Sequence, residues 1–323
     1  MRKPGRRSLN SPENHMTNPR KKKKLSPMAR EDRRDFWCFL SPWLLGFTLF
    51  GAGPILAAVF LSFTDYNIFN RPHWTGLANY RAMLNDPLVP KALYNTLFYT
   101  VFAVPLGTFF SLLLALLLNT KVRGLALWRT LFYLPTVVSG VAMGVLWRWI
   151  FNPEVGLLNT LLHPFLHMLN LPDPKWLLDP HLAKPAYILM SLWGVGGGMI
   201  IFLAGLQSIP KQLYEAAEID GAGALARFRH VTLPMLSPVV FFSLTMGFIG
   251  SFQIFTQAYV MSGRGVDNST LFYVLYLFDQ AFRYFRMGYA AALAWVLFAI
   301  VLAVTLLQFR LARRWVYYEG GAA

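Results

Sequence analysis

The sequence predicts an all-α integral membrane protein with six transmembrane helices and with both termini in the cytoplasm. Three observations lead to this fold class: a shortage of charged residues, a set of long uncharged segments, and an unequal distribution of Lys and Arg between them. Of the 323 residues, 55% are hydrophobic and 14% are charged, whereas soluble domains carry about 25% charged residues. This deficit indicates that lipid surrounds most of the chain.

Six uncharged segments are each long enough to cross a hydrocarbon core about 30 Å thick. We expect each to be a helix, because backbone polar groups inside lipid are satisfied only in helices or closed barrels. The predicted spans lie near residues 39–63, 95–119, 128–150, 185–207, 235–261 and 287–310. Together they form one membrane domain, residues 36–318, between a basic N-terminal tail, 1–35, and a short C-terminal tail, 319–323.

The basic residues predict the orientation of this domain. With the tail 1–35 inside, the cytoplasmic segments hold 21 Lys and Arg residues and the outer segments hold 8, as the positive-inside rule requires. The net charge of +15 could suggest nucleic acid, but no basic stripe is interleaved with aromatic residues, so we expect no nucleic-acid partner. The tail is expected either to contact anionic membrane lipid or to serve topology alone.

Metal chemistry is not expected. Cys38 is the single cysteine, which excludes intrachain disulfides and Cys-based metal sites. His163 and His167 have a spacing that metals tolerate, but Pro164 lies between them and no acidic residue is close in the sequence. We therefore predict no zinc site there.

Residues 208–233 connect the predicted fourth and fifth spans and predict two short helices joined by a turn. Ser208 and Pro210 are typical of a helix start, and Lys211 can pair with Glu215 one turn later. Gly221 can adopt the left-handed backbone conformation that ends a helix.

The second short helix is expected to pass through Phe228 and to lead to Pro234, where the fifth span starts. The predicted product is a helix–turn–helix elbow beneath the membrane. Its small alanines allow another backbone to approach closely.

The same residues resemble the EAA motif of ABC importer permeases at each characteristic position. The matching residues are Glu215, Ala216, Ala217, Asp220, Gly221, Ala222, Phe228, Val231, Leu233 and Pro234. Further segments resemble the carbohydrate permeases of that family, and the resemblance covers roughly residues 36–318. One departure occurs at Gly263-Arg264-Gly265, where relatives usually show Gly-Gly-Pro, which leaves the conformation of that outer loop open.

The resemblance implies the type I ABC importer permease fold and a role in the uptake of a sugar or sugar derivative. The subunit resembled is the first of two permeases in maltose, lactose and glycerol-phosphate importers of bacterial or archaeal cell membranes. The implied partners are a second homologous permease, two copies of an ATPase subunit and an extracytoplasmic solute-binding protein. No cofactor is expected on this chain, because ATP would bind the partner subunit.

The elbow, residues 208–233, is implied to be the site where the ATPase subunit docks. Glu215, Ala217 and Gly221 would form the docking surface, and Asp220 would cap or brace the turn. The alternative from the residues alone is an ordinary amphipathic helix in a loop.

Polar residues within the spans are candidates for the substrate pathway, since they are costly in lipid unless they face the bundle or water. Gln253 and Gln257 would share one face of the predicted fifth span, near Ser251, and could bind sugar hydroxyls. The alternative is hydrogen bonding between helices. Trp193 in the fourth span could stack on a sugar ring or serve packing alone.

Two further features are expected to be structural. Asn95 is expected to make a local hydrogen bond at the outer start of the second span. The glycines at 194 and 196–198 lack the lysine of a phosphate-binding loop, so they predict close packing or a helix kink.

Other classes of membrane protein fit less well. A self-contained secondary transporter should show repeated halves and buried charges for ion coupling, and a membrane-embedded enzyme should show converging His, Asp, Glu or Cys in its spans. Neither pattern occurs, and no Gly-x4-Gly-Lys-Ser/Thr motif is present. We therefore expect a transport component without catalytic residues, with a permease for a non-sugar solute as the remaining alternative.

Overall fold

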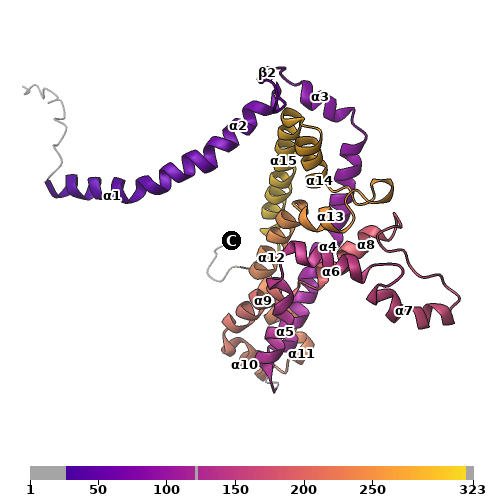
Figure 1. The fold of residues 1–323 in the computed structure, drawn as a ribbon. Coiled ribbons are helices and arrows are strands. Elements are labelled where there is room, and N and C mark those ends of the chain that lie inside the picture. The colour runs from indigo at the N-terminus through magenta and orange to yellow at the C-terminus, as the bar shows by residue number, and fades with distance from the viewer. Residues whose placement is uncertain (1–26, 121–122, 318–323) are drawn as a thin grey trace, which may run out of the picture. The chain divides into compact units, whose positions relative to one another are not determined.

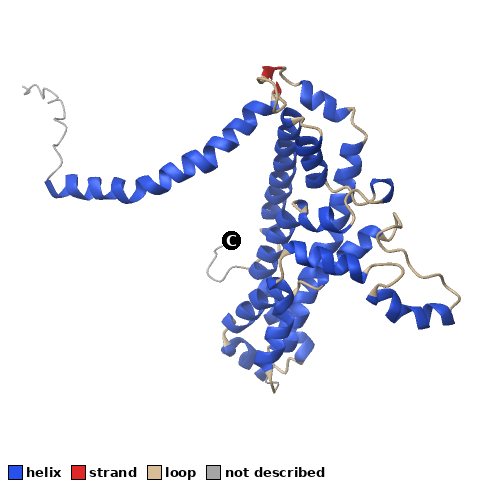
Figure 2. Cartoon of the chain, in the orientation of Figure 1, coloured by secondary structure: helices blue, strands red, loops and turns tan. Residues whose placement is uncertain are grey.

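The structure, a computed structural model, describes residues 27–120 and 123–317. Most of the predicted tail 1–35 and all of the tail 319–323 lie outside the described residues. The chain divides into two compact units, Met1–Leu56 and Ala57–Ala323, which we describe separately. Nearly all regular structure is helical (Figure 2), which confirms the predicted all-α class.

The described part of the first unit is a helical rod with a largely exposed apolar surface. It comprises α1 (Pro27–Gly46), η1 (Phe47–Ala52) and the start of α2 (Gly53–Ser62). Large apolar side chains such as Phe39, Phe50 and Leu56 are exposed. Such a surface indicates contact with lipid or with another subunit.

The second unit contains the end of α2 and all later elements (Figure 1). Its elements up to the predicted elbow are β1 (Thr64–Asp65), β2 (His73–Trp74), α3 (Ala78–Leu84), α4 (Leu88–Leu118), α5 (Leu125–Val137), α6 (Gly140–Ile150), α7 (Leu157–Met168), α8 (Ala183–Leu192) and α9 (Gly196–Ser208). The remaining elements are α10 (Lys211–Ile219), α11 (Ala224–Arg227), η2 (Phe228–Thr232), α12 (Leu233–Phe252), α13 (Thr256–Met261), η3 (Val266–Asn268), α14 (Tyr273–Phe278), η4 (Asp279–Arg283) and α15 (Met287–Ala312).

Among the described residues, four helices are long and apolar enough to cross a membrane: Arg34–Ser62, Leu88–Leu118, Ala224–Phe252 and Met287–Ala312. The number rises to six if each of two bent pairs counts as one span. The pair α5–α6 is bent by 97° and the pair α8–α9 by 45°.

The expectation of one continuous helix is therefore wrong for the segments 128–150 and 235–261, whereas the break in the segment 185–207 agrees with the kink expected there. Val138 and Ser139 have extended backbones, and the Ser139 side chain caps α6 by accepting a hydrogen bond from the Ala142 N–H at 3.3 Å. The fourth segment breaks at residues 193–195, and the fifth breaks at residues 253–255. A count of uncharged residues cannot locate such breaks, because it measures length and polarity only.

Gly196 shows why the glycines occur at the α8–α9 break. A Cβ atom at this position would lie 1.9 Å from the Phe132 carbonyl oxygen of α5, and one at Gly198 would lie 2.5 Å from the Ser111 hydroxyl of α4. Both close packing and a kink, the two expectations for this segment, are thus observed.

Helix α4 is the centre of the second unit, since it packs against α8, α9, α12 and α14. One buried cluster lies around Tyr187, Phe272 and Leu293, and a second lies around Phe202, Leu206 and Leu236. Figure 1 shows α10 and α11 at one end of this unit and β2 and α3 at the other.

Asn95 corrects a prediction, because its hydrogen bonds are long-range. It is fully buried, and its side-chain amide donates to the carbonyls of Asn268, at 2.8 Å, and Leu271, at 3.1 Å. Lys184 donates to its oxygen at 3.4 Å. Asn95 thereby holds α4 to the segment that leads into α14.

The segment 152–184 contains α7, and Pro164 lies within this helix. No carboxylate was expected near His163 and His167, and this expectation is wrong, since His163 Nδ1 is 3.1 Å from an oxygen of Asp173. Within residues 27–120 and 123–317, no three His, Cys, Asp or Glu residues gather in a metal-binding group.

Asp86, between α3 and α4, connects three elements at the end of the unit opposite the elbow. Its carboxylate accepts hydrogen bonds from the hydroxyls of Tyr276 and, at 2.8 Å, Tyr289, and from the Leu88 N–H at 2.9 Å. Burial raises the pKa of Asp86, but these hydrogen bonds and the charge of Arg286 outweigh it, so the pKa lies below its ordinary value of 3.8.

We predict that Asp86→Asn lowers the thermal unfolding midpoint of the purified protein at neutral pH and reduces the loss of stability in acid. A carboxyl group with a lowered folded-state pKa stabilises the fold above its unfolded pKa, and this contribution is lost as the pH falls through the folded pKa. The measurement is the unfolding midpoint from pH 7 to pH 3. Asp65→Asn, at an exposed position in β1, is the control, and equal pH profiles for wild type and Asp86→Asn would contradict the prediction.

Candidate functional site

The elbow predicted at residues 208–233 is present. Helix α10 starts after Pro210 and ends at Ile219, and Gly221 has a φ of +77°. The Gly221 N–H donates to the Glu218 carbonyl at 3.0 Å, and the Ala222 N–H donates to the Ala217 carbonyl at 2.9 Å. This pair of hydrogen bonds is a Schellman motif, and the left-handed conformation explains the glycine at 221.

Two side-chain contacts hold the elbow together. The hydroxyls of Tyr214 and Thr232 lie 3.0 Å apart, and Arg227 pairs with Glu218 across the turn. The predicted pair of Lys211 and Glu215 is not among the ion pairs of the described residues. The ion pair that forms bridges two helices rather than one turn of α10.

Two expectations about the start and the turn of the elbow are not met. The Ser208 hydroxyl donates back to the Gly205 carbonyl of α9 at 2.8 Å and does not cap α10. Asp220 ends α10 through its backbone N–H, which donates to the Ala216 carbonyl at 3.0 Å. Its carboxylate makes no hydrogen bond within the described residues.

The second helix of the elbow is not separate from the fifth span, which corrects the prediction that this span starts at Pro234. The helix is continuous from Ala224 to Phe252, with the π-helical turn η2 within it. Pro234 lies in the first turn of α12, and Phe228 is half-buried at the base of the helix.

The elbow exposes apolar side chains that sequence reasoning missed. Ile219 is 87% exposed and Leu225 is 80% exposed, on either side of Gly221. Glu215 and Ala216 are also exposed, and Ala217 is partly so. Exposed apolar side chains beside small residues are typical of a protein contact surface. The signal was available, because Ile219 follows the apolar face of α10 and Leu225 lies among small residues.

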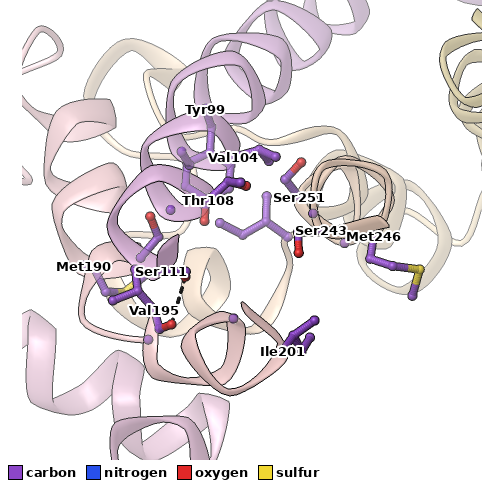
Figure 3. Close-up of a pocket in the computed structure, with 18 of the residues that line it drawn as sticks. Tyr99, Val104, Thr108, Ser111, Met190, Val195, Ile201, Ser243, Met246 and Ser251 are labelled. Atoms are coloured by element: carbon purple, nitrogen blue, oxygen red, sulfur yellow. Dashed lines mark hydrogen bonds between the residues drawn. The ribbon is translucent and has the colours of Figure 1, made fainter. Parts of the chain in front are cut away.

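A cavity of about 500 Å³ lies between α4, α8, α9 and α12. Its lining is mostly apolar, with Val104, Met190 and Met246 among its members. Figure 3 shows hydroxyl groups from two helices around the same space: Thr108 and Ser111 of α4, and Ser243 and Ser251 of α12, beside Val195 of the α8–α9 break.

The cavity-lining hydroxyls differ in their hydrogen bonding. Ser111 donates to the Val195 carbonyl at 2.8 Å, at the α8–α9 break, and Ser251 donates to the Phe248 carbonyl at 3.0 Å. The Ser243 oxygen is buried and has no hydrogen-bond partner among the described residues. Thr108, Ser111 and Ser243 were not predicted, although small hydroxyl residues inside otherwise apolar spans were a visible signal.

Gln253 and Gln257 both line this cavity, but not for the predicted reason. Helix α12 ends at Phe252, Gln253 is its C-cap, and Gln257 lies in α13, so the two do not share one helix face. Ser251 completes the trio of predicted residues that the structure brings to the cavity.

Trp193 is not part of the cavity lining. Its ring packs edge-on against Trp147 at 5.9 Å between ring centroids, in the break between α8 and α9. The structure therefore matches the packing alternative for this residue.

The loop with the unusual Gly263-Arg264-Gly265 sequence is held by a buried carboxylate. Asp279 is fully buried, and Arg264 Nε lies 2.9 Å and Arg283 Nε lies 3.0 Å from its two oxygens. Burial lowers the pKa of Arg264, but the hydrogen bond and charge of Asp279 outweigh it and raise the pKa. Gly263 and Gly265 both have positive φ, so this loop folds tightly around the ion pair.

Residues 89–317 match the family model of the binding-protein-dependent transport system inner membrane component. The probable ABC transporter permease protein YesP of Bacillus subtilis is 43% identical over 92% of this chain and 96% of its own length. The lactose transport system permease protein LacF of Rhizobium radiobacter is 36% identical over 86% of this chain and 93% of its own length.

Among solved structures, the fold is similar to a chain in a bacterial ABC transporter involved in the import of the acidic polysaccharide alginate. The TM-score is 0.78 with 22% sequence identity, and the match covers 90% of this chain and 99% of the other. The all-helical architecture, the elbow and these matches agree. The chain belongs to the family of binding-protein-dependent transport system inner membrane components.

Proposed function

We propose that this chain is one of two permease subunits of an ABC importer and forms half of the translocation pathway for a sugar or sugar derivative. The other subunits would be a second homologous permease, two copies of an ATPase subunit that binds ATP, and an extracytoplasmic solute-binding protein. The elbow and both termini would face the cytoplasm. The observation that carries the proposal is the exposed elbow at the base of a continuous helix that ends at the cavity.

The elbow has the properties of a docking surface for the ATPase subunit. Ile219 and Leu225 present apolar area on either side of the turn, while Ala216 and Ala217 leave room for a second backbone. Glu215 adds an exposed negative charge. A partner that buries the two apolar side chains would gain roughly 1.5–3 kcal/mol for each one.

Five more residues of the predicted motif act through the shape of the elbow. Gly221 and Ala222 form the turn, Asp220 ends α10, and Phe228 and Pro234 lie at the base of the continuous helix. Movement of the docked ATPase subunit would reach the cavity through this helix.

The cavity has the chemistry that a polyhydroxylated solute requires. Hydroxyls and amides both donate and accept hydrogen bonds, and Ser251, Gln253 and Gln257 place such groups beside apolar walls. Relatives of the chain carry names that refer to arabinooligosaccharides, lactose and sn-glycerol-3-phosphate. These names support a sugar or a sugar derivative as the solute.

Uptake by proteoliposomes tests this function. The chain, purified with its partner subunits and supplied with the binding protein, should accumulate a radiolabelled sugar with ATP and not without it. The sugar panel would contain arabino-oligosaccharides, lactose and glycerol 3-phosphate. Accumulation by this chain alone, driven by an ion gradient, would identify a secondary transporter instead, and ATP-driven uptake confined to amino acids or peptides would reject the sugar.

Gly221→Pro should abolish ATP-driven uptake although the protein still inserts into the membrane. Proline fixes φ near −65° and lacks the N–H that donates to Glu218, so it cannot adopt the φ of +77° at this turn. The ATPase subunit should no longer copurify with the variant.

Gly223→Ala is the matched control for this substitution. Gly223 has a φ of −67°, and a Cβ atom there would have no neighbour within 4 Å, so uptake should persist. Wild-type uptake by Gly221→Pro with the ATPase subunit bound would refute the role of the elbow.

Gln257→Leu should raise the apparent KM for uptake by about two- to tenfold, which corresponds to one hydrogen bond worth roughly 0.5–1.5 kcal/mol. ATPase coupling should be retained, because Gln257 lies in α13, beyond the end of the continuous helix that begins in the elbow. The control is Thr256→Val, which removes a hydroxyl from the adjacent residue, outside the cavity lining. An unchanged KM in both Gln257→Leu and Gln253→Leu would assign the two amides to packing.

A further inference from the structure

Helix α7 has three distinct faces. Leu158, Leu162 and Leu166 are half-buried and Asn159 is buried, so these residues face the protein. An apolar exposed face consists of Leu157, Leu161, Phe165 and Met168, and a polar exposed face consists of Thr160, His163 and His167. At 100° per residue, the centres of the two exposed faces lie about 120° apart around the helix, and the protein-facing side takes up the remaining third.

The protein-facing side is held by a specific hydrogen-bond network. The Asn159 side chain donates to the carbonyls of Pro153 and Pro174, both at 3.0 Å, and accepts from Trp176 Nε1 at 2.7 Å. On the polar face, His163 pairs with Asp173 at 3.1 Å. These contacts fix the rotation of α7, so the exposure of its apolar face is not a consequence of free rotation.

The apolar face is large and continuous. Leu161 is 60% exposed, Phe165 is 67% exposed and Met168 is 77% exposed, and Val155, Leu169 and Leu171, just outside the helix, are exposed as well. Figure 1 shows α7 set apart from the bundle around α4, at the end of a long loop. Contiguous apolar area of this kind on a helix indicates a contact with something apolar.

Two features favour lipid as that contact. The helix follows α6, whose last turn carries the exposed Trp149 beside Arg148, the pair of residue types typical of a membrane–water interface. In addition, the helix presents an apolar face and a polar face to its surroundings at once, which a boundary between hydrocarbon and water accommodates. With 12 residues, α7 is too short to span the roughly 30 Å core.

We infer that α7 is an interfacial helix, which lies in the outer membrane–water boundary with Leu157, Leu161, Phe165 and Met168 among the lipid acyl chains. His163 and His167 face the water. Because α7 is joined to α6 and leads to α8, it anchors the outer ends of both bent pairs at the lipid surface. This inference needs the membrane location of the chain but does not depend on the identity of the solute or on the elbow.

Site-directed fluorescence quenching in nanodiscs tests this inference, and the single cysteine simplifies it. In a Cys38→Ser background, Leu161→Cys and Phe165→Cys would be labelled with an environment-sensitive fluorophore in the complete importer. Lipids with a shallow nitroxide on the acyl chain should quench these labels several-fold more than a label at Thr160→Cys, the matched control on the polar face.

Equal quenching on both faces, or no quenching on either, would overturn the inference. Formation of disulfide or photochemical cross-links from Phe165→Cys to a partner subunit would instead assign the face to a protein contact. If a cysteine variant fails to assemble, the wild-type importer can be tested in nanodiscs that contain a photoactivatable phospholipid. Lipid cross-links should then map to Leu157–Met168, and their absence from this helix would overturn the inference.

Discussion

Unpaired backbone groups are costly in hydrocarbon, and this constraint governs the arrangement of the second unit. A helix that crosses lipid satisfies its own N–H and C=O groups, so irregular backbone at membrane depth is tolerated only where protein or a water-filled space replaces the lost partners. Residues 194–195 and 253–254, at two of the three breaks in the predicted spans, line the cavity. At the third, a Cβ atom on Gly140 would lie 3.6 Å from the cavity-lining Gln257. The breaks therefore lie beside the cavity, and at one of them Ser111 donates a hydrogen bond to the freed backbone carbonyl of Val195.

The elbow could be predicted from the sequence, because its geometry is local. A glycine with positive φ, a proline before the first helix and alternating small residues define the turn within a dozen positions. The continuity of the second helix with α12 could not be predicted, since Pro234 is equally compatible with a break and with the first turn of a helix. The pairing of Glu218 with Arg227 rather than of Glu215 with Lys211 depends on how the two helices cross, which no local pattern encodes.

The substrate cavity illustrates a different limit. Gln253 and Gln257 were selected because polar side chains inside spans need polar surroundings, and that reason is independent of helix geometry. Both residues line the cavity although α12 ends at Phe252, before either of them. Trp193 and Asn95 were assigned from residue type and span position alone. The structure places Trp193 against Trp147 and connects Asn95 to residues more than 170 positions later, contacts that only the tertiary fold specifies.

The unbroken helix from Ala224 to Phe252 has a mechanical consequence. Its 29 residues correspond to a rod of roughly 43 Å at 1.5 Å per residue, and the described chain makes no turn along it. A continuous helix resists bending, so a tilt at its Ala224 end would also move its other end, where Ser251 and Gln253 line the cavity. The π-helical turn η2 and Pro238 both lie between the Ala224 end and the middle of this helix, so bending would be concentrated there and not in the half that ends at the cavity.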